Sequence, residues 1–122
     1  MEEQTDIEII LDSGVTVFVF KAVSISNPQK IEVVSGRIRD FIEANTPKAV
    51  VFDFKEVKFF SSQVLGLLLD IRDRLKSYNG QVVISAIEPK LHRVFTITNL
   101  DKIFRFFPDR ENAVTALKTN ID

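Results

Sequence analysis

The feature that most constrains the fold is the alternation of short apolar segments with longer segments of helical period. The segment KAVVFDF at 48–54 is almost unbroken in its hydrophobicity, which is typical of a strand covered on both faces. The segment before it, 29–45, carries apolar residues at three- and four-residue steps with charges between them, as on an amphipathic helix. A chain that repeats this alternation forms mainly parallel strands linked by helical crossovers.

The N-terminal part of the chain predicts a β-hairpin. IEIILD (7–12) and VTVFVFK (15–21) are rich in β-branched and aromatic residues, and Ser13-Gly14 separates them. Glycine supplies the positive φ that a tight turn requires. The second segment is apolar on both faces, so we expect it inside the sheet rather than at an edge.

The remaining elements follow from the same patterns. Asn27 is placed to cap the first helix and Asp109 the last, and the apolar stripe of the second helix begins at Val64. Asn79-Gly80 ends that second helix. The sequence predicts helices over 29–45, 62–77, from Pro89 onward and from Asp109 to about 118, and strands over 48–54, 81–87 and 103–107.

The element order β-β-α-β-α-β-α-β-α predicts an α/β fold. We expect one mixed, mostly parallel sheet of about five strands, with about four helices packed over it. The 122 residues fit a single domain over 1–122, without repeats or linkers. Residues 1–5 are expected to be a flexible N-terminus.

Composition excludes several classes of function. The net charge of −1 lacks the basic excess of a nucleic-acid-binding protein. There is no cysteine for a disulfide or a thiolate metal site. No apolar run reaches the roughly 20 residues that span a bilayer, and the acidic start is unlike a signal peptide. We therefore expect a cytoplasmic protein that does not insert into a membrane.

Catalytic residues are hard to find in this sequence. His92 is the only histidine, and its neighbours on the predicted helix favour a surface position over a metal or catalytic role. Asp53 ends a strand, where a carboxylate usually accepts backbone N–H bonds for structural reasons. No phosphate-binding glycine loop or hydrolase nucleophile motif is present. The sequence indicates a protein that is not an enzyme.

Two adjacent hydroxyls, Ser61 and Ser62, interrupt the apolar run VKFFSSQVLGLLL at 57–69. Spacing alone favours a helix cap, in which one hydroxyl accepts a hydrogen bond from an unpaired backbone N–H. The same geometry suits a phosphorylation site, because a phosphate at a helix start is stabilised by free N–H groups and the macrodipole. Such a phosphate would add a charge of about −1.5 to −2 to a neutral surface and expel a partner packed there.

The segment VVFDFKEVKFFSSQVLGLLL (50–69) resembles the signature of STAS domains, in particular bacterial anti-sigma factor antagonists. In that family a strand ending in a pattern such as L-D-L is followed by F-I-D-S-S-G-L-G-x-L-L. The resemblance continues through RLKSYNGQVVISAI and VFTITNLDKIF and covers essentially the whole chain. Three positions depart from the family: Ser61 replaces its aspartate, Val64 its glycine, and Val23 an acidic residue common in the loop before the first helix.

The resemblance implies partner switching controlled by a phosphoserine. Ser62 would be the phosphoacceptor, with Ser61 as the alternative. The unphosphorylated domain would bind an anti-sigma factor, often itself a serine protein kinase, and a phosphoserine phosphatase would restore binding. ATP would belong to the kinase, so no cofactor is expected. The expected contact surface comprises Ser24, Asn27, Ser61, Ser62, Gln63 and Val64.

Other functions stay open at this point. The domain could be a constitutive scaffold or a subunit of a sensory or transport complex without phosphorylation, and a homodimer is compatible with either function. An enzyme would require Ser62 and His92 to act together.

Overall fold

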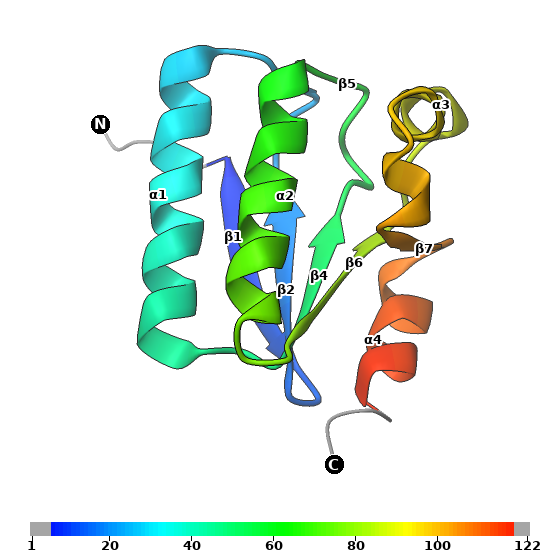
Figure 1. The fold of residues 1–122 in the computed structure, drawn as a ribbon. Helices are drawn as coiled ribbons and strands as arrows, with labels where there is room; N and C mark the ends of the chain where they lie inside the picture. Colours follow the sequence, from blue (N-terminus) through cyan, green and yellow to red (C-terminus); the bar gives the residue numbers. More distant parts are fainter. Residues whose placement is uncertain (1–5, 119–122) are drawn as a thin grey trace.

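A five-stranded mixed sheet organises the described part of the chain. The computed structural model describes residues 6–118, so the expectation for residues 1–5 lies outside the described part. The strand order is β1-β2-β4-β6-β7, in which β1 is antiparallel to β2 and all other pairs are parallel (Figure 1). The strands are β1 Ile7–Asp12, β2 Val15–Phe20, β4 Ala49–Asp53, β6 Gln81–Ser85 and β7 Arg105–Phe107.

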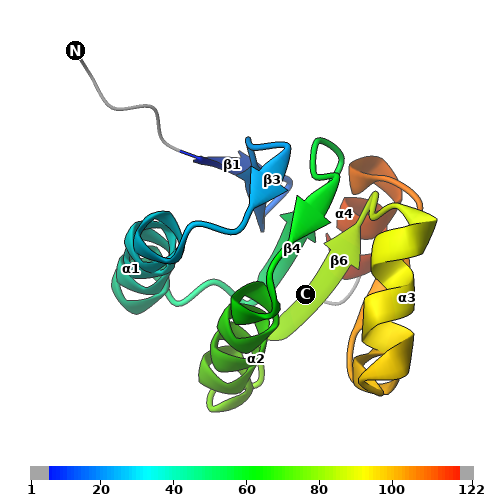
Figure 2. The same ribbon diagram turned by 90° about the horizontal axis from the view of Figure 1, so that it is seen from above.

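Within residues 6–118, four α-helices cover the two faces of the sheet unequally. They are α1 Pro28–Asn45, α2 Ser62–Lys76, α3 Pro89–Ile97 and α4 Arg110–Lys118. Each parallel crossover moves to the next strand in the same direction, and right-handed crossovers then place α1, α2 and α3 on one face. Seen from above, α4 lies on the opposite side of the sheet from α1 and α2 (Figure 2). The predicted α/β class, sheet and helix number are confirmed.

The alternation of side chains along the strands builds two separate cores. In β2, Phe18 and Phe20 belong to the larger core under α1 to α3, whereas Val17 and Val19 belong to the smaller core under α4. Every residue of β2 is buried, as expected for an internal strand. The period of two in the sequence therefore decides which helices each side chain meets.

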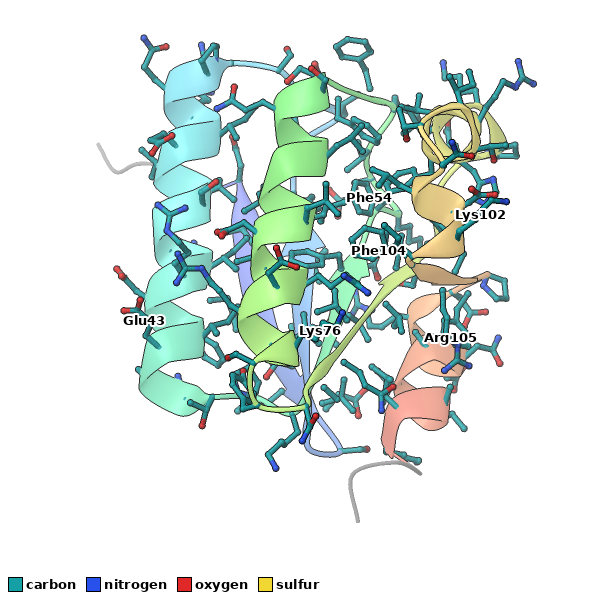
Figure 3. All side chains as sticks on the ribbon, viewed as in Figure 1. Glu43, Phe54, Lys76, Lys102, Phe104 and Arg105 are labelled. Atoms are coloured by element: carbon teal, nitrogen blue, oxygen red, sulfur yellow. The ribbon has the colours of Figure 1, made fainter. Side chains whose placement is uncertain are left out.

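Phenylalanine rings run through the larger core as a connected series. Neighbouring ring centroids lie between 5.0 and 6.2 Å apart, in stacked, tilted or edge-to-face arrangements that aromatic pairs prefer. Figure 3 shows Phe54 and Phe104 in the space between α2 and the α3 region. The series passes through Phe18, Phe52, Phe20, Phe54, Phe60, Phe95 and Phe104.

The turns that the sequence predicted are present. Ser13 and Gly14 both have positive φ, 56° and 84°, as a two-residue hairpin turn requires. The side-chain oxygen of Asn27 accepts from the backbone N–H of Lys30 at 3.0 Å, and that of Asp109 accepts from Asn112 at 2.8 Å. Both predicted caps are confirmed.

Four strands are shorter than predicted, β2 by one residue and β4 by one residue at each end, and two strands were not predicted. The strand expected over 81–87 ends at Ser85, because Ala86 has a φ of 58° that leaves the extended region. The one expected over 103–107 begins at Arg105, after a 3₁₀ turn at Leu100–Lys102. A separate two-stranded parallel sheet pairs β3, Ser24–Ile25, with β5, Phe59–Phe60. Within 6–118, no helix has the length and hydrophobicity needed to cross a membrane.

Candidate functional site

The small β3–β5 sheet brings the loop before α1 to the start of α2. Ser24 pairs with Phe59 and Ile25 with Phe60. The backbone N–H of Ser61 then donates to the carbonyl of Ile25 at 3.0 Å. The predicted grouping of the two segments is therefore present, and backbone hydrogen bonds hold it together.

Ser62 is the first residue of α2 and its side chain is exposed. The backbone N–H groups of Ser62 and Gln63 have no acceptor within the helix, since the first turn of a helix leaves its donors unpaired. No acidic residue lies in this first turn. The hydroxyl of Ser62 therefore stands at the positive end of a helix, in surroundings that favour an anion.

Ser61 differs from Ser62 although the two are adjacent. It occupies the N-cap position with extended backbone, φ −87° and ψ 165°, but its side chain makes no capping hydrogen bond. Its Oγ is buried and has no hydrogen-bond partner among the described residues. The expectation that one of these hydroxyls caps α2 is wrong, because the Ser61 side chain turns into the protein rather than toward the helix N–H groups.

This difference predicts opposite effects for two alanine substitutions. Asn27→Ala removes a formed cap from α1 and is expected to lower the free energy of unfolding by about 1 kcal/mol. Ser61→Ala removes a buried hydroxyl without a partner, so stability is expected to stay unchanged or to rise by up to about 1 kcal/mol. Urea unfolding followed by circular dichroism measures both. An equal loss for the two variants would mean that Ser61 caps α2 in solution.

The other predicted contact residues divide into exposed and buried ones. Ser24, Asn27 and Gln63 are exposed, and Ser24 Oγ lies 3.3 Å from the hydroxyl of Ser26. Val64 is fully buried in the larger core. Val64 therefore does not belong to the contact surface as predicted, because the helix directs its side chain toward the sheet.

Apolar side chains complete the exposed surface around Ser62. Phe59 and Phe60 are adjacent in β5 and point in opposite directions: Phe60 is buried, whereas Phe59 is 54% exposed. Val23 is 63% exposed, and its carbonyl accepts from the N–H groups of Lys58 and Phe59 at 2.7 and 3.1 Å. The surface therefore combines hydroxyls, a helix start and exposed hydrocarbon.

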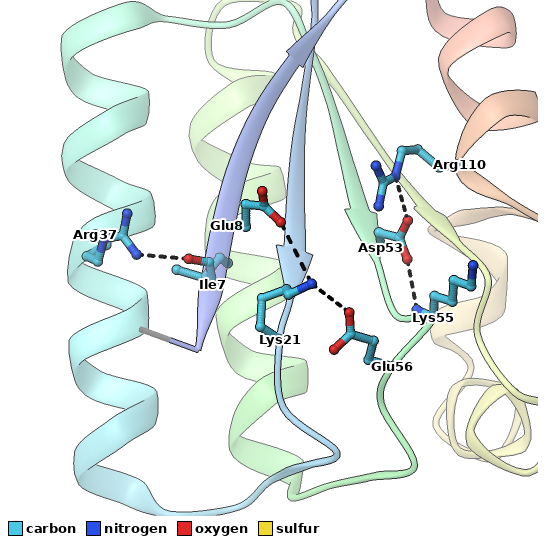
Figure 4. A network of polar contacts seen from close by, with 8 residues as sticks. All are labelled: Ile7, Glu8, Lys21, Arg37, Asp53, Lys55, Glu56 and Arg110. Atoms are coloured by element: carbon cyan, nitrogen blue, oxygen red, sulfur yellow. Dashed lines mark hydrogen bonds and ion pairs between the residues drawn. The ribbon is translucent and has the colours of Figure 1, made fainter. Parts of the chain in front are cut away.

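The polar network on the other face of the sheet has a structural role. Asp53 is buried; one carboxylate oxygen accepts from the backbone N–H of Lys55 at 2.8 Å and the other from Arg110 Nε at 2.9 Å (Figure 4). The backbone bond confirms the role expected for Asp53. The ion pair, which ties β4 to α4, was not foreseen.

The groups whose titration is shifted lie outside the residues gathered around Ser62. A hydrogen bond to Glu56 raises the pKa of Lys21, and burial raises the pKa of Tyr78. A hydrogen bond from Lys58 lowers the pKa of Glu88, and this 2.6 Å ion pair ties the segment before β5 to the start of α3. These shifts reflect structural contacts rather than a proton-transfer site.

His92 has a packing role. Its ring meets that of Phe106 edge-on, with centroids 4.5 Å apart, and the residue is half-buried rather than fully on the surface as expected. In the described part of the chain, no group of three or more His, Cys, Asp or Glu side chains could hold a metal ion. The exposed groups at the start of α2 therefore form the candidate binding surface.

The sheet carries α1 and α2 on one face and α4 on the other, and an exposed hydroxyl stands at the start of α2. The family model of the STAS domain matches residues 9–113. The chain therefore belongs to the STAS domain family, as the signature at 50–69 indicated.

Relatives from bacteria share part of the sequence. A STAS-domain containing protein of Pseudomonas aeruginosa is 29% identical over 75 residues, which are 57% of this chain and 74% of that protein. An anti-sigma F factor antagonist of Paenibacillus polymyxa is 23% identical over 87 residues, 71% of this chain and 74% of that protein.

Solved structures share the fold along almost the whole chain. A STAS domain protein of Planctomyces limnophilus has a TM-score of 0.83 at 23% identity, over 93% of this chain and 98% of that one. An anti-sigma factor antagonist from Mycobacterium paratuberculosis has a TM-score of 0.78 at 26% identity, covering 90% and 91%. The phosphorylated form of SpoIIAA, a Bacillus cell fate determinant, has a TM-score of 0.71 at 18% identity, covering 91% and 98%.

Proposed function

We propose that this chain is an anti-sigma factor antagonist whose binding to its partner is switched by phosphorylation of Ser62. The observation that carries the proposal is the contrast between two neighbouring hydroxyls. Ser62 is exposed at the first residue of α2, whereas the Ser61 Oγ is buried. A kinase needs an accessible oxygen, so Ser62 is preferred over Ser61 as the phosphoacceptor.

Similarity to named antagonists supports this function. The Paenibacillus relative and the Mycobacterium structure are both described as anti-sigma factor antagonists. SpoIIAA has been solved with and without phosphate, so a domain of this fold can carry the modification. In the proposed cycle the unphosphorylated chain binds an anti-sigma factor that is also a serine protein kinase, and a phosphoserine phosphatase reverses the modification in the cytoplasm.

The physical basis of the switch is local. A phosphate on Ser62 would bring a charge of about −1.5 to −2 to the unpaired N–H groups of α2, which stabilise it. The fold would therefore persist. A partner packed on this surface would have to strip water from the phosphate, which is costly without a matching cation.

The test uses purified anti-sigma factors of the source organism as a panel, with isothermal titration calorimetry as readout. Ser62→Asp is expected to weaken binding at least tenfold, roughly the effect of 1.4 kcal/mol, while the melting temperature changes little because an acidic residue suits a helix start. Thr115→Asp, an exposed position on α4, supplies the same charge as a control.

Phosphorylation itself is tested with the binding factor and ATP, followed by mass spectrometry. The label is expected on Ser62 and should disappear in Ser62→Ala. Binding by Ser62→Asp that equals the wild type would contradict the switch. It would instead favour a constitutive scaffold, the role in which phosphorylation plays no part.

A further inference from the structure

One phenylalanine at the site lies outside the two cores, to which the other phenylalanines contribute. The chain has eleven phenylalanines, and Phe59 is the one among them that the structure places in an exposed position. In β5 the side chains alternate, so Phe60 and its neighbour Ile25 face inward while Phe59 and Ser24 face outward. The phenyl ring therefore stands beside a hydroxyl on the outer face, three residues before Ser62.

The backbone under this ring is held firmly. Both Lys58 and Phe59 donate to the carbonyl of Val23, and Phe60 packs against the rings of Phe54 and Phe95. The Lys58–Glu88 ion pair fixes the residue before β5. A ring whose backbone is already ordered loses little conformational freedom on binding, which favours it as an anchor.

Its surroundings indicate what kind of surface it fits. Val23 extends the exposed hydrocarbon next to Phe59, while Ser24, Ser26 and Ser62 supply hydroxyls around it. Aromatic residues are enriched at the centres of protein interfaces, with polar groups at the rim. The complementary surface is an apolar recess bordered by hydrogen-bonding groups.

We propose that Phe59 is the anchor that the anti-sigma factor partner binds, with its ring inserted into an apolar recess of that partner; this inference rests on the proposed function. The recess closes over the ring and excludes water from the neighbouring Ser62. A phosphate on Ser62 then faces a dry rim, where burial of its charge is most unfavourable. The bound ring would therefore increase the loss of partner affinity that the phosphate charge causes.

The test measures the affinity of Phe59→Ala for the factor that binds the wild-type chain in the panel. The expected loss is about 30-fold, as for an interface hot spot, with an unchanged circular dichroism spectrum. Phe59→Leu is expected to lose less, because it keeps most of the apolar volume. Leu11→Ala is the matched control: Leu11 is similarly exposed but lies at the end of β1 next to the hairpin turn, and its variant should bind like the wild type.

A double-mutant cycle tests the link to Ser62. If the ring closes the site to water, Ser62→Asp should weaken binding less in the Phe59→Ala background than in the wild type. A loss below threefold for Phe59→Ala, while Ser62→Asp still weakens binding tenfold, overturns the anchor and leaves the proposed function standing. A panel in which no factor binds overturns both.

Discussion

Replacing Phe54 with alanine is expected to lower the free energy of unfolding by about 3–5 kcal/mol, the range for a buried phenylalanine. Phe54 follows β4 and is fully buried. Its ring centroid lies 5.0 Å from that of Phe20 and 5.8 Å from that of Phe60. The substitution removes the link between the sheet and β5, and a small domain has only about 5–15 kcal/mol of stability to lose.

Chemical unfolding by urea measures this loss, and two variants make the result specific. Phe54→Leu keeps most of the volume and is expected to cost less than about 1.5 kcal/mol. Phe59→Ala removes an exposed ring five residues further along the chain, and its free energy of unfolding should stay within about 0.5 kcal/mol of the wild-type value. A loss below about 1 kcal/mol for Phe54→Ala would show that the aromatic series does not support the fold as described.

Loss of the Phe54 ring should also loosen the candidate site. Phe60 loses one of its two ring contacts, and β5 is only two residues long. Amide hydrogen exchange at Ser61, whose N–H is bonded to Ile25, is therefore expected to speed up in Phe54→Leu, which stays folded. Core packing and the shape of the binding surface are thus linked through one side chain.

The sheet and its helices could be predicted because each carries a repeating signal. Strand β2 alternates valine with phenylalanine over Val17–Phe20, and α1 repeats its apolar positions over 18 residues after a capping asparagine. Strands β3 and β5 have two residues each, too few for any period to appear. Their pairing depends on carbonyls such as that of Val23 meeting donors 35 and 36 residues along the chain.

The site residues show the same limit. Spacing could place Ser61 and Ser62 at the start of α2, but not say which hydroxyl is exposed, because the rotation of each side chain depends on the surrounding packing. For Val64 the signal was available: it begins the apolar stripe that continues to Leu68 and Ile71, all of them buried. The helical period alone could therefore have predicted that Val64 is buried and does not contact a partner.

Local sequence patterns could not predict the ion pair between Asp53 and Arg110, because its partners are 57 residues apart. Its removal gives the second large prediction. The Asp53 side chain is 2% exposed and that of Arg110 is 38% exposed. Arg110→Met leaves a buried carboxylate without its countercharge, which costs about 3–5 kcal/mol for a fully buried pair. Because water reaches Arg110, we expect a smaller loss of about 2 kcal/mol.

Removing the charge from both partners separates this effect from lost packing. In Asp53→Asn combined with Arg110→Met, the amide oxygen can still accept from Lys55 N–H and no unpaired charge remains, so stability should exceed that of Arg110→Met alone. Lys21→Met, which breaks an exposed ion pair with Glu56 at 2.7 Å, is the control and should change stability little. If the double variant is less stable than Arg110→Met, the loss comes from hydrogen bonding and packing of α4 rather than from the buried charge.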